Sequence, residues 1–157
     1  NKSGALSRKD QEGTMRPSWD ETFIELALVI ARRSKDPSSK VGACIVDANK
    51  RIISLGYNGY PSGIDDTACT DTREVKLYKT LHAEENAILF AQRNLQGTTL
   101  YVTHMPCPRC AAKIVQVGIG AVVFLPQASF EERWADELRI TREIFDQAKV
   151  AYRYLIL

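Results

Sequence analysis

The chain has 157 residues, of which 45% are hydrophobic and 25% are charged, and its formal net charge is +2. This size and composition predict one soluble globular domain with a proper core. The charge is far below the basic footprint of a nucleic-acid-binding protein, and no apolar run approaches the ~20 residues of a membrane helix. We therefore expect a small-molecule substrate, no nucleic acid and no membrane partner. Four cysteines without a disulfide-type framework favour a reducing compartment, so we expect a cytoplasmic protein.

Residues 1–14 are polar and lack hydrophobic periodicity, and Met15 follows them. We expect either a remnant appended for expression, with Met15 as the native start, or a disordered native tail, and we favour the first. Residues 15–157 would then form the functional domain.

Hydrophobic periodicity along this domain predicts alternating helices and strands. Helices are expected over 19–33, 82–93, 107–117 and 130–147, and strands over 41–46, 51–57, 98–103, 120–125 and 150–157. Residues 64–80 form a polar insertion without clear periodicity. This order predicts an α/β fold with three layers, in which helices sandwich a five-stranded mixed sheet.

Two short motifs carry the chemistry. His82 precedes Glu84 by two residues, and Cys107 and Cys110 follow as a Pro-Cys-x-x-Cys motif. One imidazole and two thiolates suit zinc and leave a fourth position for water, whose pKa a catalytic zinc lowers to about 7. Glu84 is placed to move protons without binding the metal. A structural zinc ribbon would need a second cysteine pair, whereas Cys44 and Cys69 are isolated.

The chain resembles the deoxycytidylate (dCMP) deaminases of the cytidine deaminase superfamily from about residue 19 to its end. The two motifs match the zinc deaminase signature, and the similarity extends through SKDPSSKVGACIVD (34–47), GYNGYPSG (56–63) and HAEENAILFAQR (82–93). The resemblance implies zinc-dependent hydrolytic deamination of dCMP to dUMP with release of ammonia. It also implies a homohexamer that dCTP activates and dTTP inhibits, and Mg²⁺ could accompany a triphosphate effector.

The same resemblance assigns residues to substrate and effector. Asn58 has a donor and an acceptor for the sugar hydroxyl, and Ala83 lies at a helix start where backbone N–H groups are free. Arg93 follows His82 by about three helical turns, so it could grip a 5′-phosphate, although a helix C-terminal arginine is the plain alternative. Substrate contacts are thus expected at Asn58, Ala83, Phe90 and Arg93, and effector contacts at Lys40, Gly56, Tyr57, Gly59, Tyr60, Pro61 and Gly63.

Some relatives carry a second, structural zinc, but the only histidines here are His82 and His104, and Cys69 has no nearby partner. We therefore expect one zinc per chain. His104 could line the substrate pocket or compete for metal. Other readings stay open: deamination of dCTP or free (deoxy)cytidine, a riboflavin-pathway pyrimidine deaminase, and an inactive nucleotide-binding regulatory subunit. The presence of Glu84 argues against the last.

Overall fold

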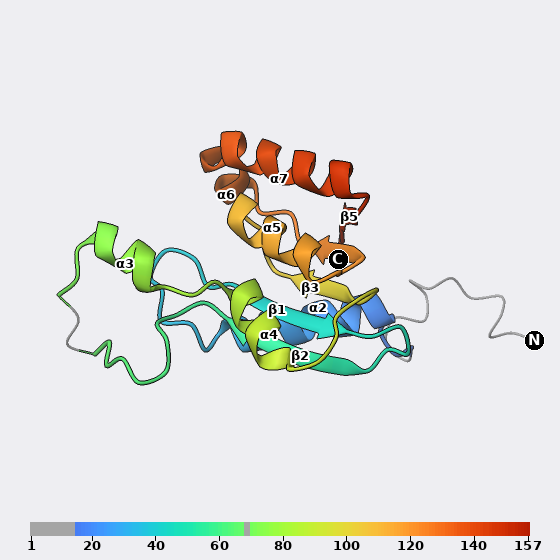
Figure 1. Ribbon diagram of the computed structural model, residues 1–157. Coiled ribbons are helices and arrows are strands. Elements are labelled where there is room, and N and C mark those ends of the chain that lie inside the picture. Colours follow the sequence, from blue (N-terminus) through green and yellow to red (C-terminus); the bar gives the residue numbers. More distant parts are fainter. Residues whose placement is uncertain (1–14, 68–69) are drawn as a thin grey trace, which may run out of the picture.

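The computed structural model describes residues 15–67 and 70–157 (Figure 1). The expectations for residues 1–14 and for Cys69 lie outside this part of the chain. In chain order the elements are α2 Trp19–Ala31, β1 Gly42–Val46, β2 Ile52–Tyr57, α3 Arg73–Lys79, α4 Ala83–Ala91, β3 Thr99–Val102, α5 Pro108–Gln116, β4 Ala121–Phe124, α6 Ala128–Arg133, α7 Ala135–Ala148 and β5 Ala151–Tyr154.

The strands form one mixed sheet in the order β2-β1-β3-β4-β5. β1 is antiparallel to both β2 and β3, whereas β3, β4 and β5 are parallel to one another. The parallel strands are joined by the helical crossovers that such pairs require. The expected five-stranded mixed sheet is confirmed.

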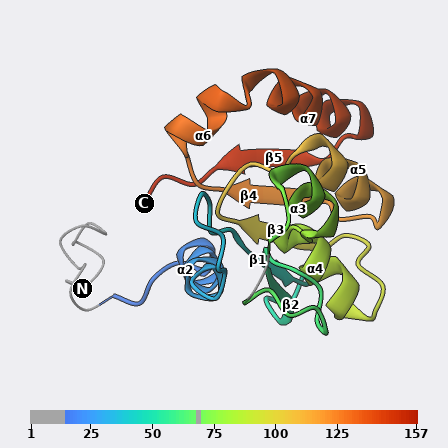
Figure 2. The same cartoon turned by 90° about the vertical axis from the view of Figure 1, so that its left-hand side faces the viewer.

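Helices cover both faces of the sheet (Figure 2). On one face, Phe23, Ile24 and Ala27 of α2 pack against Cys44 and Tyr101 of the sheet. On the other face, α4, α5 and α7 enclose the larger core, whose fully buried members include Ala87, Leu100, Ile114, Val122, Phe124, Leu138 and Phe145. The arrangement is the expected three-layer sandwich. Within the described residues, no helix has the length and apolar character needed to span a bilayer.

Polar contacts fix the start of α2. Ser18 and Glu21 form a capping box that satisfies two free N–H groups of the first turn. Asp20 on this turn accepts hydrogen bonds of 2.6 Å from the hydroxyl of Tyr101 and from the guanidinium of Arg153. The helix is therefore tied to β3 and β5 as well as packed on β1.

Close approach of two helices to the sheet depends on glycine. A Cβ at Gly42 would lie 1.9 Å from the carbonyl oxygen of Ala27 in α2. A Cβ at Gly56 would lie 2.3 Å from the carbonyl oxygen of Ala83 in α4. Both obstacles are backbone atoms, so any side chain at either position would push a helix off the sheet.

Several predicted boundaries differ from the structure, and three of the differences have a clear physical reason. The polar insertion contains the short helix α3, which buries none of its residues and so shows no apolar period. The predicted helix over 130–147 is interrupted at Trp134, which separates α6 from α7. The predicted helix over 82–93 ends at Ala91, because Gln92 adopts a left-handed conformation with φ 51°.

Candidate active site

Three donor atoms converge where α4 and α5 begin. The Nδ1 atom of His82 lies 3.6 Å from the sulfur of Cys107 and 3.3 Å from that of Cys110. All three donors lie within 4.8 Å of one another. Tetrahedral zinc with ordinary bond lengths separates a nitrogen and a sulfur ligand by about 3.6 Å. The donors therefore already have the spacing of a zinc site.

Both ligand-bearing helices start at a ligand. His82 is the N-cap residue of α4 and Cys107 is the N-cap residue of α5, with Pro108 at the first helical position. Helix starts have free N–H groups and a partial positive charge, which favour thiolates. Within the described chain, the metal-ligand group contains three residues and no fourth His, Cys, Asp or Glu, which leaves room for water.

Hydrogen bonds between the three side chains shift their pKa values in different directions. The pKa of Cys107 falls to about 4, chiefly because its sulfur accepts a hydrogen bond from Cys110 and then because of His82. The same contact with Cys107 raises the pKa of His82 to about 9. The pKa of Cys110 is raised, because its thiol donates to Cys107 and is buried. Metal ligands bind in their deprotonated forms, so binding of a metal to this group would release protons.

Glu84 lies beside this group and is 4% exposed. Burial raises the pKa of its carboxyl to about 7, and the negative charge of Cys107 adds to the shift. A carboxyl that titrates near neutrality can both accept and release a proton at that pH.

Asn58 is buried beside the start of α4. Its amide oxygen accepts from the backbone N–H of Val41 at 2.9 Å, and its amide nitrogen donates to the carbonyl of Ser39 at 3.0 Å. Lys40, between these two partners, donates to the carbonyl of Ser34. Asn58 therefore holds the loop before β1 in place, and its contact with Ser39 uses one of its two amide N–H groups.

The loop after β2 is joined to α4 through its backbone. Gly59 and Leu81 exchange two hydrogen bonds of 2.8 and 3.0 Å, and the side chain of Asn86 donates to the carbonyl of Tyr57 at 2.7 Å. Gly56, however, faces the backbone of α4 at close range. Packing thus provides a reason for Gly56 that the sequence did not reveal.

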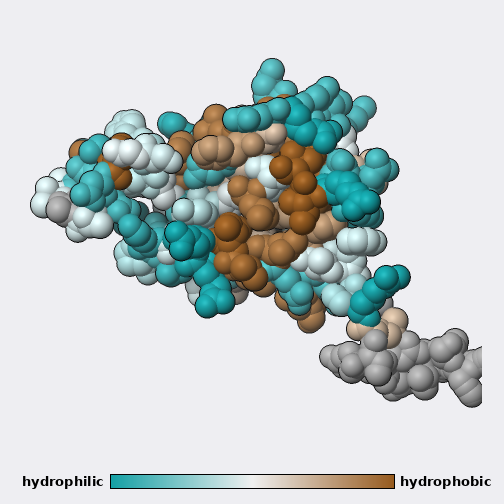
Figure 3. Space-filling model, turned by 90° about the horizontal axis from the view of Figure 1, so that it is seen from below, coloured by the Kyte–Doolittle hydropathy of each residue, from teal (hydrophilic) through white to brown (hydrophobic). Residues whose placement is uncertain are grey.

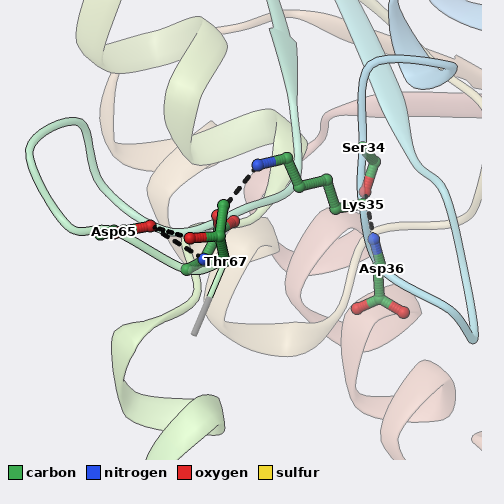
Figure 4. A network of polar contacts seen from close by, with 6 residues as sticks. Ser34, Lys35, Asp36, Asp65 and Thr67 are labelled. Carbon is green, nitrogen blue, oxygen red and sulfur yellow. Dashed lines mark hydrogen bonds and ion pairs between the residues drawn. The ribbon is translucent and has the colours of Figure 1, made fainter. Parts of the chain in front are cut away.

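The segment that follows projects from the body of the molecule and carries α3 (Figure 1). Tyr60 and Lys79 both contact Asp71, at 3.1 and 3.0 Å. Lys35 forms an ion pair of 2.9 Å with Asp66, next to the hydrogen bonds between Asp65 and Thr67 (Figure 4). Polar contacts anchor this segment, whereas the sheet is held by an apolar core.

Phe90 and Arg93 lie toward the opposite end of α4 from His82. Phe90 is 65% exposed. Arg93 follows the end of the helix, donates to the carbonyl of Asn94, and lies 3.9 Å from the carboxylate of Asp47 in the β1–β2 turn. Because α4 ends at Ala91, three helical turns do not bring Arg93 to the His82 side. Its assignment to phosphate now depends on family resemblance.

His104 is not part of the metal-ligand group found among the described residues. Its Nδ1 atom lies 2.7 Å from the hydroxyl of Thr103, and its ring packs edge-on against Phe130. Burial lowers the pKa of His104, which favours the neutral ring.

Two residues that sequence reasoning missed support the cysteine loop. The hydroxyl of the buried Thr141 in α7 donates to the carbonyl of Pro106 at 2.8 Å, directly before Cys107. The amide of Gln127 donates to the carbonyl of Thr103 at 2.9 Å. No local signal marks either residue, because each partner lies more than twenty positions away in the chain.

Comparison with known proteins agrees with this geometry. Residues 17–126 match the family model of the cytidine and deoxycytidylate deaminase zinc-binding region. An uncharacterized deaminase from the luxG 3′ region of Aliivibrio fischeri is 49% identical over 91% of this chain and 97% of its own length. Human deoxycytidylate deaminase is 37% identical over 88% of this chain and 80% of its own length.

A solved structure of a dCMP deaminase is also similar to this chain. The dCMP deaminase of cyanophage S-TIM5, in complex with dCMP and dUMP, superposes with a TM-score of 0.73 at 29% identity and covers 90% of this chain and 99% of its own. Family match, identity and fold therefore agree with the three zinc-spaced donors and the buried Glu84. The chain belongs to the cytidine and deoxycytidylate deaminase family of zinc-dependent enzymes.

Proposed function

We propose that this protein catalyses the hydrolytic deamination of dCMP to dUMP with release of ammonia. The observation that carries the proposal is the buried carboxyl of Glu84 beside the donors His82, Cys107 and Cys110. The cyanophage relative is described with dCMP and dUMP, a pair that differs by this reaction. The human relative is named deoxycytidylate deaminase, and the cyanophage relative is named dCMP deaminase.

His82, Cys107 and Cys110 would hold one zinc ion per chain. When bound, zinc supplies a Lewis acid that makes water acidic enough to react near neutral pH. Glu84 accepts a proton from the attacking water and delivers it to the ring nitrogen. It then takes the second proton, from the hydroxyl that the addition leaves on the carbon, and delivers that proton to the departing amine. A carbon–oxygen bond forms, the carbon–nitrogen bond breaks, and ammonia leaves. A carboxyl whose pKa is about 7 suits both halves of this transfer.

We assign substrate contacts to Asn58, Ala83, Phe90 and Arg93. Asn58 would hold the deoxyribose through the second N–H of its side-chain amide. Ala83 is fully buried at the start of α4, next to the proton-transfer residue. The roles of Phe90 and Arg93, at the far end of α4, are proposed from the family resemblance.

We further propose that nucleoside triphosphates regulate the enzyme. dCTP would activate and dTTP would inhibit, with Mg²⁺ as a companion of the triphosphate. The effector contacts would come from Lys40, Gly56, Tyr57, Gly59, Tyr60, Pro61 and Gly63. The backbone bridge between Gly59 and Leu81 supports coupling, because it links this loop to the residue before His82.

We also propose that the chain assembles into a homohexamer. Apolar side chains gather on the face of the molecule seen from below (Figure 3). Exposed apolar residues occur on α2, on the edge strand β2 and on α4, and they include Trp19, Leu28, Val29, Ile52, Leu55, Leu89 and Phe90. Exposed apolar surface of this kind marks interaction sites, and a second copy of the chain is the partner that a homo-oligomer would supply.

An ammonia-release assay tests the activity. The substrates would be deoxycytidine, dCMP, dCDP, dCTP, CMP and a riboflavin-pathway pyrimidine, each with and without dCTP and dTTP as effectors. We expect the highest kcat/KM with dCMP. A higher value with dCTP, free nucleoside or the riboflavin precursor would transfer the assignment to that substrate. A zinc-loaded sample that releases no ammonia from any of them would favour the inactive regulatory subunit.

A further inference from the structure

We propose that Glu85 and Lys113 act as a positioning pair that holds the start of α4 against α5, so that His82 meets Cys107 and Cys110 in a preformed metal site. The inference rests on the zinc site of the proposed function. Its test uses metal alone, so it can fail while dCMP deamination stands, and it can hold if another substrate is the correct one.

The first step is the contact between Glu85 and the backbone of His82. The Oε1 atom of Glu85 accepts a hydrogen bond of 2.8 Å from the N–H of His82. His82 is the N-cap residue of α4, with an extended backbone of φ −81° and ψ 160°. This backbone conformation sets the direction in which the imidazole leaves the chain. A hydrogen bond that holds the N–H therefore also holds the ligand.

The second step is the contact to the other ligand-bearing helix. The Oε2 atom of Glu85 accepts from the ammonium of Lys113 at 2.6 Å. Lys113 lies on α5, three residues and about one turn after Cys110. The two oxygens of one carboxylate thus join the backbone of the histidine ligand to the helix that carries the cysteine ligands.

The Glu85–Lys113 pair joins two helices that pack mainly on different elements. α4 packs mainly on β1 and β2, whereas α5 packs mainly on α7. Between α4 and α5 lies a groove of about 200 Å³, lined by Ile88, Leu89, Gln116 and Val117 together with the pair itself. The pair bridges the helices at the end of this groove where the metal donors lie. The pair therefore adds a direct polar link between the two helices, beyond the core that they share.

The alternative is an ordinary surface ion pair. Glu85 is 18% exposed and Lys113 is 47% exposed at the side chain, and partly exposed pairs commonly add little to stability. Such a pair would leave metal affinity unchanged when it is removed. Residues that orient metal ligands behave differently, because their loss weakens metal binding by about 10- to 100-fold.

The experiment measures zinc release from four variants of the full chain with a chromogenic chelator in excess and no nucleotide. Glu85→Ala removes both contacts. Glu85→Gln keeps an acceptor for the N–H of His82 but loses the charge, and Lys113→Met removes the ion pair alone. Arg139→Met is the matched control, because Arg139 forms an exposed ion pair of 3.6 Å with Asp136 on α7. Cobalt-substituted samples report ligand geometry through the thiolate-to-metal absorption bands.

We expect Glu85→Ala to release zinc at least about tenfold faster than the parent. Glu85→Gln and Lys113→Met should give smaller increases, and Arg139→Met should match the parent. The cobalt spectrum of Glu85→Ala should shift while its Tm stays within a few degrees of the parent value. Zinc release within twofold of the parent in Glu85→Ala would overturn the proposal. If Glu85→Ala does not fold, equal release rates for Lys113→Met and Arg139→Met would overturn it.

Discussion

Replacement of Gly56 by alanine tests whether this position serves packing or a ligand. Gly56 belongs to the loop motif that the family resemblance connects with effector binding. In the structure it is buried on β2 and faces the first turns of α4. A Cβ there would lie 2.3 Å from the carbonyl oxygen of Ala83 and 2.5 Å from the nitrogen of Ala87.

The size of the effect follows from these distances. Ordinary contact with a Cβ starts at 3.4 Å, so β2 and α4 would have to separate by about 1 Å. Overpacking of this kind costs about 1–3 kcal/mol, and we expect the upper end because helix backbone cannot rotate away as a side chain can. For a domain of this size the loss corresponds to a Tm lower by about 6–12 °C. Because Ala83 lies between His82 and Glu84, zinc affinity should fall as well.

Urea unfolding of Gly56→Ala measures the free energy, with Gly59→Ala as the matched control. Gly59 lies in the same loop, but no atom lies within 4 Å of a Cβ built there. The control should change the free energy of unfolding by no more than about 0.5 kcal/mol. A loss below about 0.5 kcal/mol in Gly56→Ala itself would refute the packing argument and leave an effector contact as the reason for the glycine.

Glu84→Gln should retain zinc and fold but lose at least about 10²-fold in kcat, since glutamine cannot carry the proton; a zinc-loaded variant with a near-parent rate would remove Glu84 from the mechanism. Metal analysis should return one zinc per chain, and two tightly held ions would contradict the single site. Arg93→Ala should cost about 1.5–3 kcal/mol in kcat/KM with dCMP, nothing with deoxycytidine, and should flatten the response to dCTP and dTTP. Equal losses with both substrates would mean that Arg93 only supports the end of α4. Burial opposes ionisation of Asp20, but hydrogen bonds from Tyr101 and Arg153 hold the pKa of this carboxyl below its ordinary 3.8. The stability that the carboxylate contributes is therefore present above that pH and is lost as the pH falls below it. Asp20→Asn should therefore lose less stability than the parent on acidification in urea titrations, and parallel acid profiles would exclude this contribution.

The zinc ligands could be predicted from the sequence because each half of the site is a short local motif whose residue types suit zinc. The two halves lie 25 to 28 positions apart, and the fold brings them together. The catalytic role of Glu84 stays a prediction. His82 and Glu84 lie two residues apart, and Cys107 and Cys110 lie three apart, so each pair belongs to the start of a single helix. The geometry of a helix start then places both residues of a pair close together in space. The alternation of apolar segments was equally local, and it predicted the five strands and the layered fold.

Contacts between distant segments could not be predicted this way. Lys113 meets Glu85 across 28 positions, and Thr141 reaches Pro106 across 35. The glycine at position 56 is required by a helix that begins 27 positions later. Arg93 lies beyond the end of α4 because Gln92 adopts a left-handed conformation. Such outcomes depend on how helices settle on a twisted sheet, where a few tenths of an ångström decide whether atoms touch. A periodic pattern shows which face of an element is buried, and the packed fold selects the partner that buries it.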